Sequence, residues 1–233
     1  MYTKKDAYDF LAGLEGELRT RLPAPTAMKA LMAGPEYRDG SPSKIRENVY
    51  LYQILPRICE YMQKVPGIGP AEVHASVLCE YHSKVPGIAS GNPFRRIGHP
   101  FRKNFGLSAD EIMKTWTKPP GALPPNQAYP DLCLRSPFPF KIVFDAKYFT
   151  QNDESAANKA LVEGAYEVMF YRGLPAVAAR TTSEPNWDYD YGCLLAYDAS
   201  DGGVFEMAWR SVTCKRTFWD GANIFVMIVR GSI

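Results

Sequence analysis

The chain has 233 residues, of which 46% are hydrophobic and 22% charged, a composition typical of a globular protein and unlike that of disordered or fibrous chains. The net charge of +2 averages two unequal parts: residues 1–118 carry 17 Lys and Arg against 12 Asp and Glu (net +5), whereas residues 119–233 carry 10 against 13 (net −3). A basic first half favours a nucleic-acid partner.

Other features exclude several protein classes. The chain starts with a polar stretch rather than an apolar signal core, and its longest apolar run, residues 224–229, is too short to span a membrane. The five cysteines form no Cys-x-x-Cys pair, which predicts reduced thiols and argues against a disulfide framework or a zinc site. We therefore expect a cytoplasmic protein without a membrane segment.

The first half is predicted to be mainly helical. Helices are expected over residues 3–21, 43–64 and 70–84, with a short one after Ser108. Pro23 ends the first helix, and Pro56 is expected to kink or interrupt the second.

A ten-residue segment, 59–68, recurs as residues 79–88, and both copies contain Pro-Gly near their ends. The first copy resembles the hairpin of helix-hairpin-helix DNA-binding motifs, in which backbone amides contact a phosphate. The alternative, two helix ends of similar composition, is the favoured interpretation.

Aromatic and basic residues alternate in the segments Pro-Phe-Arg-Arg (93–96) and Pro-Phe-Arg-Lys (100–103). This pattern predicts DNA contacts by Arg95, Arg96, Arg102 and Lys103, because cations bind phosphates and rings pack on bases or sugars. The alternative is a solvated basic loop that its phenylalanines anchor to the core.

A proline-rich connector, residues 118–125, separates two parts of the chain. We predict a mainly helical, basic, DNA-contacting part over residues 1–118 and an α/β catalytic core over residues 119–233, or one continuous domain that contains both. The second part predicts strands and one helix, which together indicate an α/β fold with a mixed sheet. The strands are expected at residues 132–134, 140–149, 176–180, 191–197, 204–209 and 223–230, and the helix at 153–172.

Acidic and basic residues with a chemical role are predicted on the first two of these strands. Asp145 and Lys147 are two residues apart on a strand and therefore project to the same face. If the preceding strand pairs with this one as a hairpin, Asp131 lies beside Asp145. Two carboxylates at a strand end suit Mg²⁺, whose remaining ligands are waters and phosphate oxygens. A lysine beside them can hold or help deprotonate the attacking water and balance developing negative charge.

The segments Pro130-Asp131 and Asp145-Ala146-Lys147 resemble the motif of the PD-(D/E)XK, or restriction-endonuclease-like, nuclease superfamily. The resemblance covers residues 129–197 and implies a core of an upstream helix, a motif-bearing β-hairpin, a helix packed on the sheet and a further strand. It also implies Mg²⁺ bound by Asp131, Asp145 and the Ala146 carbonyl, with Lys147 positioning the nucleophile.

Further acidic residues are candidates for this site. Many members of the superfamily add a glutamate from the first core helix, for which Glu47 is the first choice and Glu60 the second. Glu163, Tyr166 and Glu167 follow the motif on the predicted helix, where we expect a solvated face. The alternative for the motif is a turn residue at 131 and an exposed ion pair between Asp145 and Lys147.

The resulting hypothesis is a Mg²⁺-dependent double-stranded DNA endonuclease that resembles a type II restriction enzyme. It implies a homodimer, because one active site cuts one strand, and a cognate methyltransferase that acts on the same DNA site. The alternatives are a repair nuclease, a Holliday-junction-type resolvase, or a catalytically inactive DNA-binding protein of the same fold.

Overall fold

The computed structural model describes residues 2–35, 45–46, 48–79, 131–178, 189–210 and 221–232. Within these ranges, helices and strands alternate along the chain. They are α1 (Lys4–Arg21), α2 (Pro25–Met32), the π-helix η2 (Val49–Ile54), α4 (Leu55–Met62), α5 (Pro70–Ser76), β1 (Val77–Cys79), β2 (Leu132–Leu134), β3 (Ile142–Phe149), α8 (Glu154–Ala178), β4 (Tyr191–Asp198), the 3₁₀-helix η4 (Asp201–Gly203), α9 (Val204–Arg210) and β5 (Ile224–Val229).

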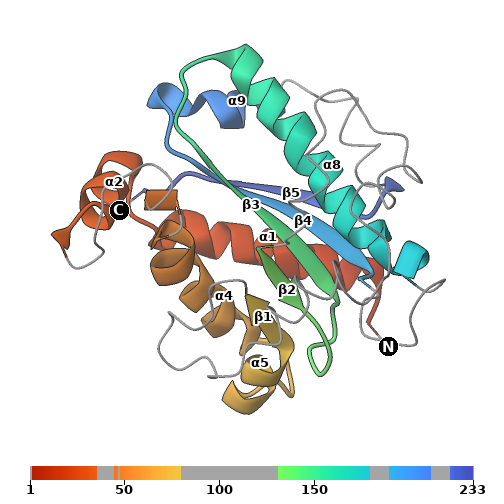
Figure 1. Ribbon diagram of the computed structural model, residues 1–233. Helices are drawn as coiled ribbons and strands as arrows, with labels where there is room; N and C mark the ends of the chain where they lie inside the picture. Colours follow the sequence, from red (N-terminus) through yellow and green to blue (C-terminus); the bar gives the residue numbers. More distant parts are fainter. Residues whose placement is uncertain are drawn as a thin grey trace.

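The strands form one mixed sheet in the order β1-β2-β3-β4-β5. The first three strands pair antiparallel, whereas β3, β4 and β5 run parallel (Figure 1). The long helix α8 connects β3 to β4, as a parallel pair requires. The predicted α/β fold with a mixed sheet is therefore confirmed.

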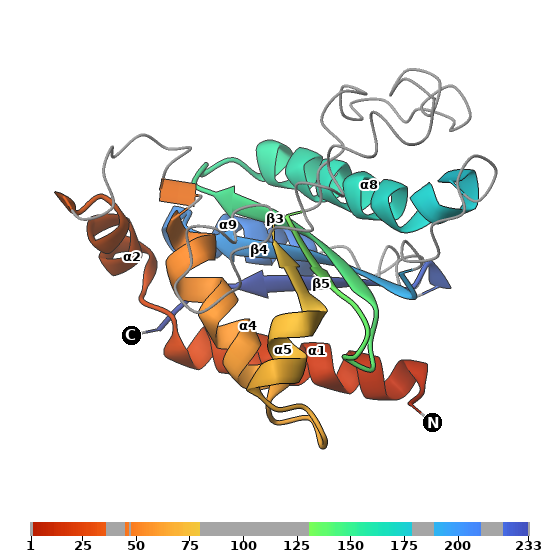
Figure 2. The same ribbon diagram turned by 60° about the horizontal axis from the view of Figure 1, so that its bottom comes forward.

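Helices cover both faces of this sheet. Figure 2 shows α8 on one face and α1 on the other, with α4 beside α1. Alternate residues of β4 serve the two sides: Cys193 and Leu195 belong to the core on the α1 side, and Leu194 and Ala196 to the core on the α8 side. The period of two in an extended strand produces this division. Because β1 and α1 come from the first half of the chain, both halves contribute to one sheet and its cover.

Local sequence signals fix the start of α1. The hydroxyl of Thr3 accepts a hydrogen bond from the Asp6 amide, and the Asp6 carboxylate accepts one from the Thr3 amide at 2.6 Å. This reciprocal capping box satisfies amides that have no partner inside a helix. Three leucines spaced along one face, Leu11, Leu14 and Leu18, are fully buried, and α1 packs on β5.

Pro56 interrupts the predicted helix over residues 43–64. It occupies the first turn of α4, where its missing amide is tolerated, and a π-helix precedes it. The amide of Leu55 accordingly donates to the carbonyl of Tyr50, five residues back. The wider turn places Tyr50 against the sheet, where its hydroxyl contacts β3 and β4.

The helix predicted over residues 70–84 ends at Ser76, and the chain continues as β1. The cause is a partner distant in sequence, since β1 pairs with β2 across more than 50 residues. The Ser76 carbonyl accepts a hydrogen bond from the Arg135 amide at 3.0 Å, which fixes this junction. The prediction of helix over residues 77–79 was therefore wrong.

Two further predictions were wrong in the second half. The helix predicted to stop at Gly173 continues to Ala178, so residues 176–178 are not a strand. Pro175 removes one hydrogen bond within this 25-residue helix, and the helix keeps its other hydrogen bonds. Residues 204–209 form α9 instead of a strand. Ser200 accepts a hydrogen bond from the Val204 amide, and Asp198 accepts one from the Glu206 amide, so polar caps start this helix.

The remaining predicted elements are confirmed in the described ranges, namely the strands at residues 132–134, 140–149, 191–197 and 223–230 and the helices that begin near residues 3 and 153. The helix predicted after Ser108 and the connector at residues 118–125 lie outside the described residues.

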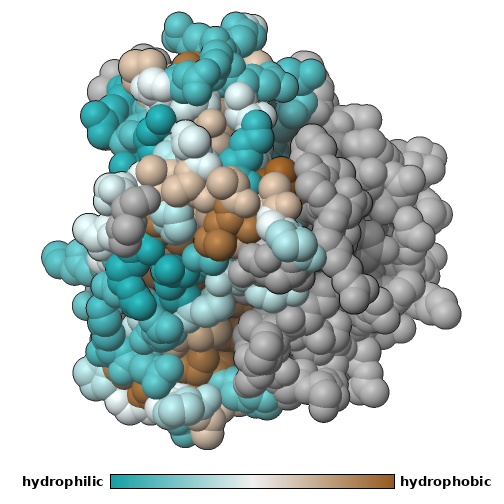
Figure 3. Space-filling model, turned by 90° about the vertical axis from the view of Figure 1, so that its left-hand side faces the viewer, coloured by the Kyte–Doolittle hydropathy of each residue, from teal (hydrophilic) through white to brown (hydrophobic). Residues whose placement is uncertain are grey.

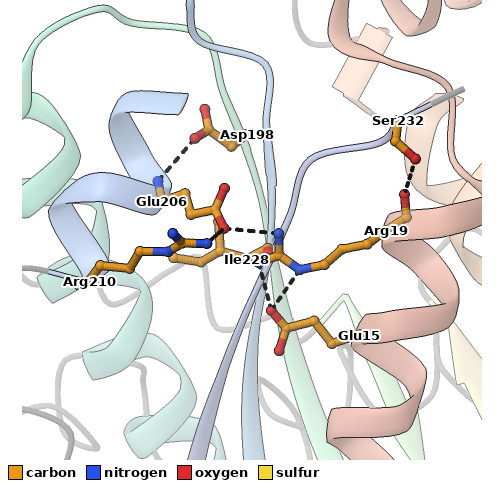
Figure 4. Close-up of polar contacts among 7 residues, drawn as sticks. All are labelled: Glu15, Arg19, Asp198, Glu206, Arg210, Ile228 and Ser232. Carbon is orange, nitrogen blue, oxygen red and sulfur yellow. Dashed lines mark hydrogen bonds and ion pairs between the residues drawn. The ribbon is translucent and has the colours of Figure 1, made fainter. Parts of the chain in front are cut away.

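Asp198 holds α9 to the end of β4 (Figure 4). It is fully buried, and its carboxylate accepts hydrogen bonds from the Glu206 amide and from the Ser200 amide, each at 3.0 Å. Glu206 in turn pairs with Arg19 of α1 and with Arg210. These contacts join α9, β4 and α1.

We expect Asp198→Asn to lower the free energy of unfolding by about 1–3 kcal/mol. The amide nitrogen of asparagine would face a backbone N–H group, whereas the carboxylate oxygen that it replaces accepts a hydrogen bond from that group. Urea unfolding measures this loss. An unchanged midpoint would show that the carboxylate is not needed as a double acceptor.

On the side of the molecule that carries α2 and α4, hydrophilic residues make up most of the coloured surface, and the most hydrophobic residues show between them (Figure 3). On α2, Leu31 is 38% exposed. Among the described residues, no helix combines the length and the hydropathy needed to cross a membrane.

Candidate active site

The hairpin of β2 and β3 brings the predicted site residues together. Leu132 pairs with Phe144, and the amide of Asp131 donates to the Phe144 carbonyl at 3.2 Å. The Asp131 carboxylate then accepts a hydrogen bond from the Ala146 amide at 2.7 Å. The predicted hairpin is thus confirmed, and Asp131 lies across from Asp145.

The backbone of Ala146 faces the same edge. In an extended strand, the amide and the carbonyl of one residue point to the same side. Because the Ala146 amide binds Asp131, its carbonyl also faces the edge of β3 beyond the end of β2. The Asp131 carboxylate and the Ala146 backbone therefore face one edge of β3, and the charge of Asp131 acts on the neighbouring Asp145.

Asp145 and Lys147 project from β3 toward α8. Asp145 is 4% exposed, and its Oδ2 atom lies 3.1 Å from the Lys147 ammonium nitrogen. The same ammonium group donates to the carboxylate of Glu167 on α8. Asp145 is buried and the Lys147 side chain is 24% exposed, so the alternative of an exposed ion pair does not hold.

Glu167 is the residue that the sequence interpretation misplaced. We expected a solvated helix face, but Glu167 is 6% exposed and contacts Lys147. The spacing of Glu167 in the sequence indicated burial, because it follows Gly164 by three residues and precedes Val168 by one, which places it on the apolar face of the helix. An acid on a buried helix face needs a partner.

Burial and mutual charge set the ionisation of this cluster. Burial raises the pKa of Asp145, and the charge of Asp131 raises it further, while Lys147 opposes both. Burial and the charge of Asp145 raise the pKa of Glu167 to about 8, again against the effect of Lys147. For Lys147, burial would lower the pKa, but the two carboxylates outweigh it and raise it. Lys147 is therefore a cation at neutral pH.

The raised pKa of Glu167 predicts a pH-dependent stability. A carboxyl whose pKa is higher in the folded than in the unfolded state binds more protons when folded, so its contribution is present at low pH and is lost as the pH rises from about 4.5 to 8. One proton gives a slope of at most about 1.4 kcal/mol per pH unit.

We therefore expect the free energy of unfolding of the wild type, measured in urea and EDTA, to fall relative to that of Glu167→Gln across this range. A constant difference between the two proteins from pH 5 to 8 would contradict the raised pKa.

A small pocket adjoins the acidic residues on the opposite face of the sheet. It measures about 40 Å³, room for a few waters, and the side chains of Arg46, Tyr50, Asp131 and Ala146 contribute to its lining. The Tyr50 hydroxyl lies 2.7 Å from the Lys147 carbonyl oxygen and 2.8 Å from that of Leu195. It therefore supports the backbone at the site.

The oxygen atoms of this region fit Mg²⁺. The buried Oδ2 of Asp145 has the Lys147 ammonium group at 3.1 Å as its ion-pair partner, and a carboxylate oxygen has more than one lone pair, so it can also bind a cation. Within the described ranges, no three His, Cys, Asp or Glu side chains form a metal-binding group. Two carboxylates and one carbonyl nevertheless suit an ion that takes one or two carboxylates and completes its octahedron with waters and phosphate oxygens.

Several predicted site residues lie elsewhere. Glu60 is 54% exposed at its side chain and pairs with Arg21 at 2.8 Å, so it has a structural partner on α1. Glu47 and the predicted DNA-binding residues Arg95, Arg96, Arg102 and Lys103 lie outside the described residues, as does Pro130. In the first copy of the internal repeat, Gly67 has a φ of 82° in the turn between α4 and α5.

Comparisons of the chain with protein-family models, with curated proteins and with solved structures find no match. Any functional argument therefore rests on the residues and their geometry.

Proposed function

We propose that the protein is a Mg²⁺-dependent endonuclease that hydrolyses phosphodiester bonds in double-stranded DNA. The observation that carries the proposal is that Asp131, Asp145 and Lys147 lie on one β-hairpin, with the half-buried Lys147 between the buried carboxylates of Asp145 and Glu167. Structural residues rarely combine three ionisable groups at such burial, whereas catalytic sites do.

The order of elements supports a restriction-endonuclease-like core. An upstream helix, the motif-bearing hairpin β2–β3, the helix α8 packed on β3 and β4, and the parallel strand β4 occur in the expected order. Fold likeness alone does not establish a reaction. Asp145 and Lys147 lie on β3 and Asp131 directly precedes β2, an arrangement that supports the proposal.

Each group has a role in this proposal. Asp131, Asp145 and the Ala146 carbonyl would hold the metal ion, which when bound polarises a phosphoryl oxygen. Lys147 is a cation in this environment, so it donates hydrogen bonds to the attacking water or the phosphate rather than acting as a base. Its charge stabilises the negative charge that develops on the phosphate oxygens.

The substrate is assigned from charge. Residues 84–118 contain seven Lys and Arg against two acids, and such a segment binds phosphates irrespective of sequence. The enzyme most resembles a type II restriction endonuclease that acts as a homodimer, with a methyltransferase that protects the same DNA site.

Digestion of plasmid DNA in Mg²⁺ tests the proposal. A restriction enzyme yields discrete fragments, whereas smears or nicks would indicate a nuclease without sequence specificity, and selective cutting of four-way junctions would indicate a resolvase. DNA binding without cleavage by the folded wild type would favour an inactive DNA-binding protein instead.

A further inference from the structure

Helix α8 forms a fitted surface around Lys147. A Cβ atom at Gly164 would lie 3.3 Å from Lys147 Cε and 2.6 Å from Leu194 Cδ1. The first distance is tight, and the second requires the buried Leu194 side chain to move. Glycine at this position of the helix therefore leaves the space that the aliphatic stem of Lys147 occupies.

One turn further along, Glu167 holds the other end of the same side chain. Residues three apart lie on the same face of a helix, so Gly164 and Glu167 both face Lys147. The Glu167 carboxylate accepts a hydrogen bond from the ammonium group, which also pairs with Asp145 on its own strand. The stem and the charge of Lys147 are thus both fixed by α8.

The second acid is not needed for charge balance. Asp145 alone would neutralise Lys147, and burying a further carboxylate opposes folding because it loses hydration. Glu167 contacts the ammonium group of Lys147 from α8, whereas Asp145 contacts it from β3. The ammonium group is therefore held between these two elements and not by Asp145 alone.

We infer that Gly164 and Glu167 are positioning residues for Lys147, one by leaving space for its stem and the other by holding its ammonium group. This inference rests on the proposed nuclease function, since it assigns to α8 the placement of the group that acts on the phosphate. Misplacing a reacting group by about 1 Å can reduce a rate by about 100-fold.

Two variants with matched controls test the inference. Glu167→Gln removes the negative charge that Glu167 carries above its pKa of about 8, so cleavage is compared at about pH 9. Glu163→Gln makes the same change at a neighbouring residue that pairs with the exposed Lys159 at 3.8 Å. Gly164→Ala adds a methyl group against Leu194 and the stem of Lys147. Gly16→Ala adds one on α1 where, among the described residues, no atom other than those of its chain neighbours and its own helix backbone lies within 4 Å. Cleavage of a plasmid in Mg²⁺ is measured in single turnover, well below each protein's melting temperature.

We expect Glu167→Gln to reduce the maximal cleavage rate constant about 10- to 100-fold and Gly164→Ala about 10-fold, as for residues that orient a catalytic group. The DNA concentration at half-maximal rate, and DNA binding in EDTA, should stay within about twofold of the wild type. The reason is that these substitutions affect the transition state and not the binding of DNA before cleavage. Both controls should match the wild type.

The outcomes separate the inference from the proposed function. If the wild type does not cleave, the function fails and the positioning role fails with it. If the wild type cleaves and both α8 variants cleave equally fast, only the inference is wrong. If Glu167→Gln does not fold, the cleavage rate of Gly164→Ala tests the inference, because this variant crowds Lys147 without altering charge. A loss of DNA binding equal to the loss of cleavage rate would also overturn the inference.

Discussion

Lys147→Met is expected to reduce DNA cleavage by about 10³-fold, the loss typical when a preorganised donor to developing negative charge is removed. Methionine keeps a stem of similar length against Gly164 and Leu194, so the change is confined to the ammonium group. DNA binding should remain, because we place binding in the basic segment rather than in Lys147. Single-turnover cleavage and a gel-shift assay measure the two quantities.

The same substitution should also destabilise the protein. It leaves Asp145 and Glu167 buried at 4% and 6% exposure without their shared cation, and an uncompensated buried charge costs about 3–5 kcal/mol. Protonation of Glu167 will relieve part of this, so the loss should be smaller at pH 5 than at pH 8.

Lys159→Met is the matched control for Lys147→Met. This lysine lies on α8, but its side chain is 72% exposed and its ion pair with Glu163 spans 3.8 Å. Exposed pairs contribute about 0–1 kcal/mol, so stability and cleavage should both stay near the wild-type values. Full cleavage by Lys147→Met would contradict the assigned role of the ammonium group.

Asp145→Asn is expected to abolish cleavage to a similar extent, about 10³-fold, but with the opposite effect on stability. Removing this carboxylate takes a buried charge out of the cluster, while Lys147 keeps Glu167 as its partner. Because burial raises the pKa of Asp145, its ionised form is unfavourable in the folded protein. The free energy of unfolding should therefore be unchanged or higher.

The two substitutions together distinguish a catalytic site from a structural ion cluster. Both should lose cleavage, and only Lys147→Met should lose stability. Asp198→Asn provides the reverse control, since that buried aspartate caps α9 and should lose stability while cleavage persists. Retained cleavage by Asp145→Asn at wild-type rates would contradict its role in holding the metal.

Much of the hairpin could be predicted from the sequence because its signals are local. Asp145 and Lys147 share a face by the period of two, and the apolar residues around them mark a strand. The pairing of β2 with β3 follows from their closeness along the chain, and it brings Asp131 to Asp145.

The contacts that the sequence did not predict depend on residues far apart in the chain. The contact between Glu167 and Lys147 is recognisable only once α8 is known to pack on β3, because the two residues are 20 apart in the sequence. Similarly, Val77 lies in a strand because β2 pairs with it. Phe205 and Ala208 of α9 are buried three apart, but a short apolar segment with Glu206 as its one charged residue before Arg210 also suited a strand.

The central claim is that the β2–β3 hairpin, with α8 behind it, forms a metal-dependent nuclease site. The most direct measurement is the conversion of supercoiled plasmid by the purified wild type in Mg²⁺ and in EDTA, beside Asp145→Asn at equal DNA occupancy. We predict cleavage by the wild type in Mg²⁺ alone, and none by the variant under either condition. Cleavage that persists in EDTA or in Asp145→Asn, or a folded, DNA-bound wild type that leaves the plasmid intact in Mg²⁺, would contradict the claim.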